Sequence, residues 1–169
     1  AVDLFSNGQT ALVIPEYGKE FGQLAYWTKQ SEDWIPTVIA KRPGCIKSIP
    51  LDINGDDRLD LLSLFGQGDE KIMAYLQEGD GSFVAKTILS LPPYFGSSAL
   101  DTVDWNQDGL TDIIYTAGDN ADYKPILKPY HGIYIYEQQS SGGFEWVQFL
   151  PLPGAYAAEV ADFDLDGDL

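Results

Sequence analysis

Four side chains that carry oxygen atoms are spaced two or four residues apart in the segment DWNQDGLTD, residues 104–112. They are Asp104, Asn106, Asp108 and Asp112. Alternate positions of a tight loop can direct their side chains toward one point. Calcium is a hard cation that takes about six to eight oxygen ligands at roughly 2.3–2.6 Å. The spacing therefore predicts a calcium-binding loop that Asp112 closes.

The same pattern recurs along the chain. Copies begin at residues 52 (DINGDDRLD) and 162 (DFDLDGDL), and the second position is always apolar (Ile53, Trp105, Phe163), so we expect it to face the core. A weaker copy, DLFSNGQTA at 3–11, has Phe5 and Ala11 at two ligand positions, and we expect it to bind no ion. The repeats begin near 3, 52, 104 and 162, and the last is truncated at Leu169.

Two other interpretations compete with a calcium loop. An EF-hand requires a bidentate Glu at position twelve, where this chain has Ser63 and Tyr115. A metal-free turn is the other, because Asp and Asn side chains accept backbone amides in turns. Two carboxylates about 4 Å apart, however, repel each other by roughly 4 kcal/mol at an effective dielectric near 20. Repulsion of that size in each copy favours a neutralising cation, and the sequence predicts two to three bound Ca²⁺.

Short β-branched and aromatic segments surround each loop. They occupy 46–51, 98–103 and 156–161 before the loops, 11–14, 59–65 and 111–116 after them, then 23–27, 71–76 and 132–137, and finally 34–40, 83–89 and 144–150. Each has four to eight residues and ends at turn residues, which indicates a strand. Four strands in a repeat of about 50 residues are typical of a propeller blade.

Phe95-Gly96 precedes Asp104, and Gly154-Ala155 stands at the matching place before Asp162. With these dipeptides, the chain resembles the FG-GAP/VCBS repeat family, whose calcium-binding blades also form the integrin alpha-subunit head. The resemblance spans essentially the whole chain. It implies an all-β, β-propeller-type fold of about three four-stranded blades, with residues 1–169 as a single propeller segment.

Three blades do not close a propeller, which typically has about four to eight. We therefore expect residues 1–169 to be a partial propeller or a fragment of a larger one, for which the family indicates seven blades. Further blades of the same parent chain, or a homo-oligomer, would complete the ring.

The resemblance also implies that the seventh position of each loop contributes its backbone carbonyl. The resulting metal ligands are Asp52, Asn54, Asp56, Arg58 and Asp60 in the first complete loop, Asp104, Asn106, Asp108, Leu110 and Asp112 in the second, and Asp162, Asp164, Asp166 and Asp168 in the third.

Charge and composition limit the classes of partner. The net charge is −16 and the pI about 4.1, which argues against nucleic acid. No apolar run reaches 18 residues, so we expect no membrane insertion. Cys45 is the single cysteine, which excludes a disulfide framework and a Cys-based zinc site. Because calcium sites of extracellular modules bind weakly, we expect an extracellular, periplasmic or cell-surface location.

In a blade of antiparallel strands, successive turns alternate between two ends. Irregular segments at 15–22, 66–70 and 117–132 fall at the end opposite the Asp loops and contain many aromatic and polar residues. Such surfaces suit proteins or sugars. We therefore expect a non-enzymatic binding or adhesion scaffold that contacts a protein or carbohydrate there. The alternative that segment 117–132 only packs on its own blade stays open.

No catalytic motif of the hydrolase, P-loop, zincin or Rossmann type is present. The alternative function is the propeller domain of a carbohydrate-active enzyme such as a polysaccharide lyase. Its acid–base candidates would be His131, Tyr130 and Lys124, with Asp119 or Asp122 orienting the histidine. A backbone contact that caps the loop is the simpler role for His131. Trp27, Trp34, Trp105 and Trp146 lie in or beside predicted strands, and we expect them to pack in the core.

Overall fold

The computed structural model describes residues 1–119 and 127–164, and this part of the chain contains strands and turns but no helix. None of these residues therefore forms an apolar helix long enough to cross a membrane. The eleven strands are β1 (Ala11–Glu16), β2 (Gln23–Gln30), β3 (Asp33–Ala40), β4 (Cys45–Leu51), β5 (Asp60–Phe65), β6 (Lys71–Gln77), β7 (Phe83–Ser90), β8 (Ser97–Val103), β9 (Asp112–Ala117), β10 (Gly132–Gln138) and β11 (Phe144–Pro151).

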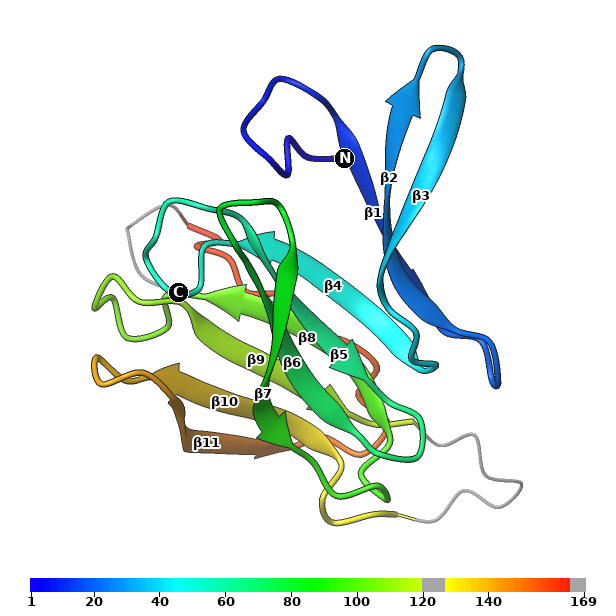
Figure 1. Ribbon diagram of the computed structural model, residues 1–169. Coiled ribbons are helices and arrows are strands. Elements are labelled where there is room, and N and C mark those ends of the chain that lie inside the picture. Colours follow the sequence, from blue (N-terminus) through cyan, green and yellow to red (C-terminus); the bar gives the residue numbers. More distant parts are fainter. Residues whose placement is uncertain (120–126, 165–169) are drawn as a thin grey trace. The chain divides into compact units, whose positions relative to one another are not determined.

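The strands form three antiparallel sheets in which neighbours in sequence are neighbours in space. The orders are β1-β2-β3, β4-β5-β6-β7 and β8-β9-β10-β11 (Figure 1). The first two sheets lie in one compact unit, Ala1–Pro93, and the third lies in a second unit, Tyr94–Leu169. The sheets have the form of propeller-type blades, as the sequence predicts, although the first has three strands and not four.

The register of the three sheets repeats at the Asp loops. Leu51 pairs with Asp60 and Val103 pairs with Asp112, so the residue before each complete loop lies opposite the ninth residue of that loop. Val2 forms an isolated bridge to Ala11 in the same relation to the weaker loop 3–11. The three loops are therefore structurally equivalent, although only two are flanked by full strands on both sides.

The predicted strands are confirmed with one exception. Residues 156–161, expected to form a strand, have no regular structure. A strand is stabilised by hydrogen bonds to a neighbour, and within residues 1–119 and 127–164 no strand pairs with this segment. The alternation of apolar residues in 156–161 is therefore not used in the described sheets.

Burial falls from the second strand of each sheet to the last. Every residue of β5 and β9 is buried, because these strands have neighbours on both sides and apolar residues at nearly every position. Most residues of β7 and β11 are exposed. The core prediction is consequently wrong for two tryptophans on outer strands, Trp34 (38% exposed) and Trp146 (60% exposed).

The core of the unit 1–93 lies between loop 3–11 and the two sheets of this unit. It contains Leu4, Ala11, Leu24, Cys45, Leu61, Phe65 and Tyr75, and beside it Phe5 packs edge-on against Tyr26 and Phe83. In the unit 94–169 the fully buried side chains include Leu100, Ile113, Ile114, Tyr115 and Ile135. Each such side chain contributes about 1.5–3 kcal/mol to the free energy of folding, and this packing holds the loop ends in place.

Candidate metal centre

The backbone of the Asp loops follows one repeated conformation. Positions four and six have positive φ in each: Ser6 (49°) and Gly8 (80°), Gly55 (74°) and Asp57 (65°), Gln107 (59°) and Gly109 (87°). This left-handed region is open to Gly and costs other residues conformational energy. The repeated pair of left-handed residues bends the chain so that the intervening backbone amides turn toward the first residue of the loop.

The first-position carboxylate receives those amides. Asp52 accepts the backbone N–H groups of Gly55 (2.8 Å) and Asp56 (3.1 Å) on Oδ1, and that of Asp57 (2.8 Å) on Oδ2. Partial burial opposes the ionisation of Asp52, but hydrogen bonds from the amides of residues 54–57 lower the pKa of its carboxyl overall. The loop therefore stabilises a negative charge at its first position.

The other loops reproduce this arrangement. Asp104 accepts the N–H groups of Asp108 (3.0 Å) and Gly109 (2.9 Å). In the weaker copy, Asp3 accepts those of Asn7 (3.0 Å) and Gly8 (2.8 Å). The first-position aspartate thus organises the loops that begin at residues 3, 52 and 104, including loop 3–11, for which no ion was expected.

The third and fifth positions contribute oxygens that also accept amides. Asn54 Oδ1 accepts the N–H of Asp56 at 3.1 Å, and Asp56 Oδ1 accepts that of Arg58 at 3.0 Å. Loop 104–112 has the matching bonds, from Asp108 N to Asn106 Oδ1 (3.1 Å) and from Leu110 N to Asp108 Oδ1 (2.8 Å). The third- and fifth-position side chains of both loops are therefore held by backbone amides of their own loop.

The ninth position is where the structure adds most to the sequence analysis. Asp60 and Asp112 have no solvent exposure. Asp60 accepts the N–H of Gln77 (2.7 Å) and of Ile53 (3.2 Å), and Asp112 accepts that of Gln138 (2.8 Å) and of Trp105 (2.8 Å). Burial, together with the charges of Asp56 and Asp52, raises the pKa of Asp60 despite these hydrogen bonds. Each ninth-position carboxylate therefore fastens its loop to the third strand of the sheet.

The donor set fits a hard cation in chemical kind. Each loop offers carboxylate and amide oxygens, and an ionised carboxylate has about four lone-pair sites, so accepting amides leaves capacity for further ligation. Within residues 1–119 and 127–164 the structure assembles no group of three or more His, Cys, Asp or Glu side chains in a metal-binding arrangement. In the structure the loops are held by hydrogen bonds, and metal ligation by the predicted residues stays a prediction.

Two residues that the sequence analysis did not connect tie the first complete loop to its surroundings. The Gln77 side chain donates to the carbonyl groups of Leu4 and Leu59, each at 2.8 Å, and so links loop 3–11 to loop 52–60. Arg58 donates from Nε to the Gln77 carbonyl at 2.9 Å and forms an ion pair with Asp56. A polar Gln at the end of the largely buried strand β6 is the sequence signal that could have indicated this junction.

The loop that begins at Asp162 is described only in part. Asp162 and Asp164 lie within the described residues, whereas Asp166 and Asp168 lie outside them. Phe163, expected to face the core, is 90% exposed. That expectation is wrong here because the segment 156–161 before it forms no strand that could carry Phe163 into a sheet interior.

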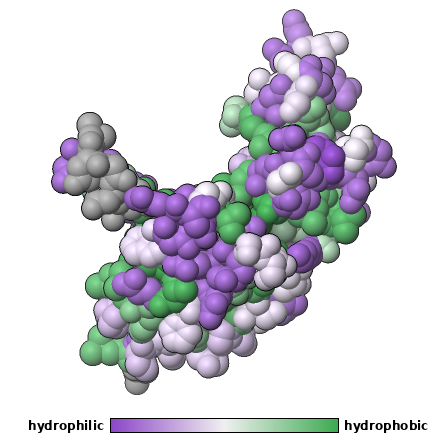
Figure 2. Space-filling view, turned by 90° about the vertical axis from the view of Figure 1, so that its left-hand side faces the viewer, coloured by the Kyte–Doolittle hydropathy of each residue, from purple (hydrophilic) through white to green (hydrophobic). Residues whose placement is uncertain are grey.

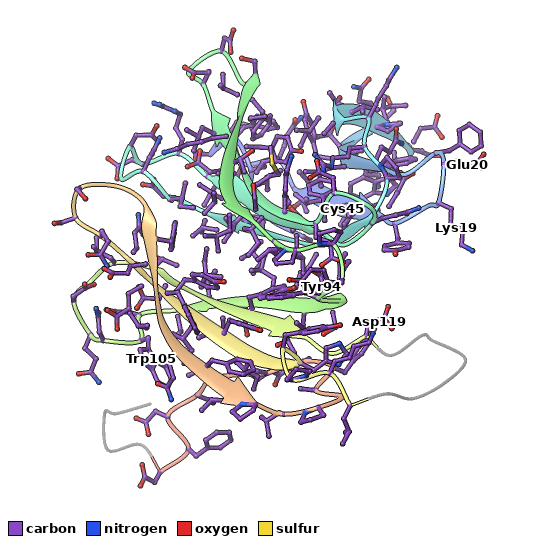
Figure 3. The ribbon with its side chains drawn as sticks, turned by 90° about the horizontal axis from the view of Figure 1, so that it is seen from below. Lys19, Glu20, Cys45, Tyr94, Trp105 and Asp119 are labelled. Carbon is purple, nitrogen blue, oxygen red and sulfur yellow. The ribbon has the colours of Figure 1, made fainter. Side chains whose placement is uncertain are left out.

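In the unit 94–169, aromatic residues gather at the end of the sheet opposite its Asp loop. Figure 3 shows Trp105, in the loop, at one end and Tyr94 with Asp119 at the other. Phe95 stacks on Tyr130, with ring centroids 5.3 Å apart, and on Tyr134, with centroids 5.4 Å apart. Tyr94 packs edge-on against Phe95 and Tyr130 and is 60% exposed.

His131 belongs to the packing of this end. Its side chain is fully buried, its backbone N–H donates to the Lys128 carbonyl at 3.0 Å, and its carbonyl accepts the N–H of Leu152 at 3.2 Å. Asp119 lies beside Gly96, whose carbonyl accepts the Asp119 N–H at 3.0 Å. Asp122 and Lys124, the other residues of the enzymatic alternative, lie outside the described residues.

In the unit 1–93 the corresponding end carries the turn between β1 and β2. Residues Glu16, Gly18, Lys19, Glu20, Phe21 and Gly22 line an open hollow of about 330 Å³, and Lys19 and Glu20 are labelled in Figure 3. Gln67 donates to the Lys19 carbonyl at 2.9 Å. On the face shown in Figure 2, hydrophilic side chains cover broad areas, in keeping with the net charge of −16.

Residues 52–115 match the family described as the FG-GAP-like repeat. The matched range begins at Asp52, includes both complete Asp loops and ends within β9. The match thus covers the structure from one loop to the next, and it confirms the resemblance inferred from the sequence over residues 52–115. No curated protein matches the chain.

Proposed function

We propose that this chain is a calcium-stabilised propeller-type scaffold that binds a protein or a carbohydrate at the sheet ends opposite its Asp loops. The observation that carries the proposal is the internal geometry that loops 52–60 and 104–112 share. Two loops of different sequence hold oxygen side chains at positions one, three and five through the same hydrogen bonds. Preorganised oxygens of this kind lower the conformational cost of binding a hard cation.

Electrostatics supports the cation. Loop 104–112 concentrates three carboxylates in nine residues, and its seventh residue, Leu110, brings no opposing charge. A bound Ca²⁺ would relieve the repulsion among them and stabilise the folded state by mass action. With dissociation constants of roughly 10⁻⁴–10⁻³ M, millimolar calcium would stabilise each loop by about 1 kcal/mol. Such affinities suit a location outside the cell, in the periplasm or at the cell surface.

The binding role rests on the aromatic end of the unit 94–169. Tyr94 is exposed but is held by contacts with Phe95 and Tyr130, so little side-chain entropy is lost when a ligand covers it. Aromatic rings supported in this way are enriched at protein interfaces and present a flat apolar surface to sugars. We propose that ligands contact this end, and that Asp119 adds a polar rim beside Gly96.

The calcium proposal is tested by thermal unfolding in excess Ca²⁺, in excess Mg²⁺ and with a chelator. Calcium should raise Tm of the wild type by a few degrees, magnesium should raise it less, and the double variant Asp104→Asn/Asp108→Asn should show a smaller calcium shift. Asp69→Asn is the matched control, since Asp69 is an exposed acid outside the loops. Equal Tm values with calcium and with chelator would overturn the proposal.

We also propose that the scaffold is not an enzyme. The full burial of His131 supports this, because an acid–base group has to reach its substrate. Incubation with a panel of acidic polysaccharides, with detection of unsaturated products, is the direct test. Product formation that is lost in His131→Ala would favour the lyase alternative. The oligomeric state is a separate proposal: further blades or other copies complete the ring, and size-exclusion chromatography with light scattering measures it.

A further inference from the structure

The seventh position distinguishes the two complete loops. In loop 52–60 it is Arg58, and in loop 104–112 it is Leu110. The Arg58 guanidinium is held at two points, by its hydrogen bond from Nε to the Gln77 carbonyl (2.9 Å) and by the ion pair of Nη2 with Asp56 Oδ2. Gln77 is itself buried and bound to both Leu4 and Leu59. The guanidinium therefore has a fixed anchor and is directed into the loop.

The contacts of Asp56 show what this guanidinium does. Its Oδ1 accepts the N–H of Arg58, and its Oδ2 accepts both the Asn54 amide (2.9 Å) and the Arg58 guanidinium. In loop 104–112 the corresponding Asp108 Oδ2 accepts the Asn106 amide at 3.1 Å, and Leu110 has no side-chain donor to add. The fifth-position carboxylate of loop 52–60 thus already faces a cation that belongs to the protein.

We propose that Arg58 is an internal counter-ion of loop 52–60, so that this loop keeps its structure without metal and binds Ca²⁺ more weakly than loop 104–112. The affinity difference rests on the proposed calcium binding, whereas the counter-ion role does not. To use Asp56 as a full ligand, a calcium ion has to displace a guanidinium that also loses its place beside Gln77. Two like charges cannot share one carboxylate oxygen in a site this small without repulsion.

The internal counter-ion is found in loop 52–60 and not in loop 104–112, because only loop 52–60 has an arginine at its seventh position. Arg is always charged, and its planar donors match the geometry of a carboxylate. The pair is partly exposed, with 40% of the Arg58 side chain and 25% of the Asp56 side chain accessible, so salt screens it in part. The chain would therefore contain one loop stabilised by its own cation and one loop that depends on an external cation.

Calcium titration by calorimetry, with native mass spectrometry to count ions, tests the affinity difference. In the wild type, loops 52–60 and 104–112 should bind Ca²⁺ with affinities about tenfold or more apart. Asp104→Asn/Asp108→Asn should abolish the tighter step, and Asp52→Asn/Asp56→Asn the weaker one. Arg58→Gln should strengthen the weaker step about tenfold, and Leu110→Arg should weaken the tighter step. Arg58→Lys, which keeps the charge but loses the hydrogen bond from Nε to Gln77, is the matched control and should strengthen the weaker step less than Arg58→Gln does.

Urea unfolding in chelator tests the counter-ion role without calcium. Arg58→Gln should lower the unfolding midpoint more than Arg58→Lys. Lys keeps a cation beside Asp56, whereas Gln can donate a hydrogen bond but leaves Asp56 without a cation. Equal midpoints for the two variants, or equal calcium affinities of the two loops in the wild type, would overturn the inference. If no variant binds calcium, the proposed metal dependence fails, and the urea comparison still decides whether Arg58 neutralises the loop.

Discussion

Asp60 accepts the backbone amide of Gln77 at 2.7 Å, across 17 residues of sequence and with both groups buried. Asp112 stands in the same relation to Gln138, at 2.8 Å. In each sheet a carboxylate at the start of the second strand therefore holds the end of the third strand, and its other oxygen holds the second residue of the loop. The Asp loop and the blade are one hydrogen-bonded unit, so the geometry of the loop is fixed by the sheet.

Replacing the ninth-position carboxylate should destabilise its own blade. Asp60→Ala leaves the amides of Gln77 and Ile53 without their acceptor, and each unsatisfied buried amide costs about 1–3 kcal/mol. We expect a loss of about 2–4 kcal/mol, measured by urea unfolding in chelator. Asp60→Asn should lose less, because one amide can still be accepted.

Asp112→Ala should have the same effect on the unit 94–169, for the same reason. Glu32→Ala, at an exposed acid in the turn between β2 and β3, is the control and should stay within about 0.5 kcal/mol of the wild type. If Asp60→Ala were as stable as Glu32→Ala in chelator, the carboxylate would be a metal ligand only, without the structural role described above.

How far the sequence predicts this structure depends on the range of the interactions. The alternation in β-strands and the spacing of Asp104, Asn106 and Asp108 are local. Local patterns predicted twelve strands, of which eleven are present in the described residues, and they identified the related loops that begin at residues 3, 52 and 104. The bonds of Asp60 to Gln77 and of Arg58 to Gln77 connect positions that are 17 and 19 residues apart. No short-range pattern encodes them, because they depend on the register of three strands.

The failures of sequence reasoning have a related cause. Trp34 and Trp146 have strand-like neighbours, and a hydrophobic pattern does not reveal which strand is outermost in a sheet. Residues 156–161 carry the same pattern as 46–51 and 98–103, yet a strand also requires a partner. Periodicity identified the segments correctly, and pairing decided which of them became strands.

Two glycines with similar φ but different surroundings allow a matched test of close packing. A Cβ at Gly96 (φ 71°) would lie 2.8 Å from the Asp119 carbonyl oxygen, whereas one at Gly109 (φ 87°) meets nothing within 4 Å. Gly109→Ala should cost about 1–2 kcal/mol from the left-handed backbone alone. Gly96→Ala should cost distinctly more, since Asp119 has to move. Equal unfolding midpoints for the two variants would show that this end of the sheet yields easily.

Glycine in place of the non-glycine residues at left-handed positions of the loops should stabilise the protein. Asp57 (φ 65°) and Gln107 (φ 59°) are exposed, and Gly adopts this conformation without the strain of a side chain. Asp57→Gly and Gln107→Gly should each raise the free energy of unfolding by about 0.5–1 kcal/mol in chelator, after allowance for the greater entropy of the unfolded chain. Ser31→Gly, at a hairpin turn with φ 59°, serves as a comparison outside the Asp loops. A loss of stability in both loop variants would mean that their side chains make contacts worth more than the strain.

Cys45 gives a pH-dependent prediction. Burial raises the pKa of its thiol to about 12, from a usual value near 9. Below pH 9 the thiol is neutral in both the folded and the unfolded chain, so its burial contributes fully to the free energy of unfolding. As pH rises from 9 toward 12, unfolded chains ionise and folded ones do not, so the unfolded state gains up to about 1.4 kcal/mol per pH unit.

Two measurements follow from the buried thiol. Native protein at pH 8 should react with a thiol reagent slowly, and denaturant should make the reaction fast. Cys45→Ala should reduce the loss of stability between pH 9 and 11 relative to the wild type, although it removes a buried side chain and lowers stability at pH 7. Rapid labelling of the native protein at pH 8, with the far-UV circular dichroism unchanged, would contradict the burial of Cys45 in the core of the unit 1–93.

At the aromatic end of the unit 94–169, one substitution should mainly lower stability and another should mainly weaken binding. Phe95 stacks on Tyr130 and Tyr134, so Phe95→Ala should cost about 3 kcal/mol or more and reduce the near-UV circular dichroism signal. Tyr94 is largely exposed and adds only edge contacts, so Tyr94→Ala should cost under about 1 kcal/mol. In a screen of immobilised glycans and candidate protein partners, Tyr94→Ala should lose ligands that the wild type retains. Trp34→Ala, at an exposed aromatic residue of β3 that lies outside the proposed binding ends, is the matched control and should retain them. If Tyr94→Ala and Trp34→Ala retained the same ligands, the aromatic end would be a packing element and the binding surface would lie elsewhere.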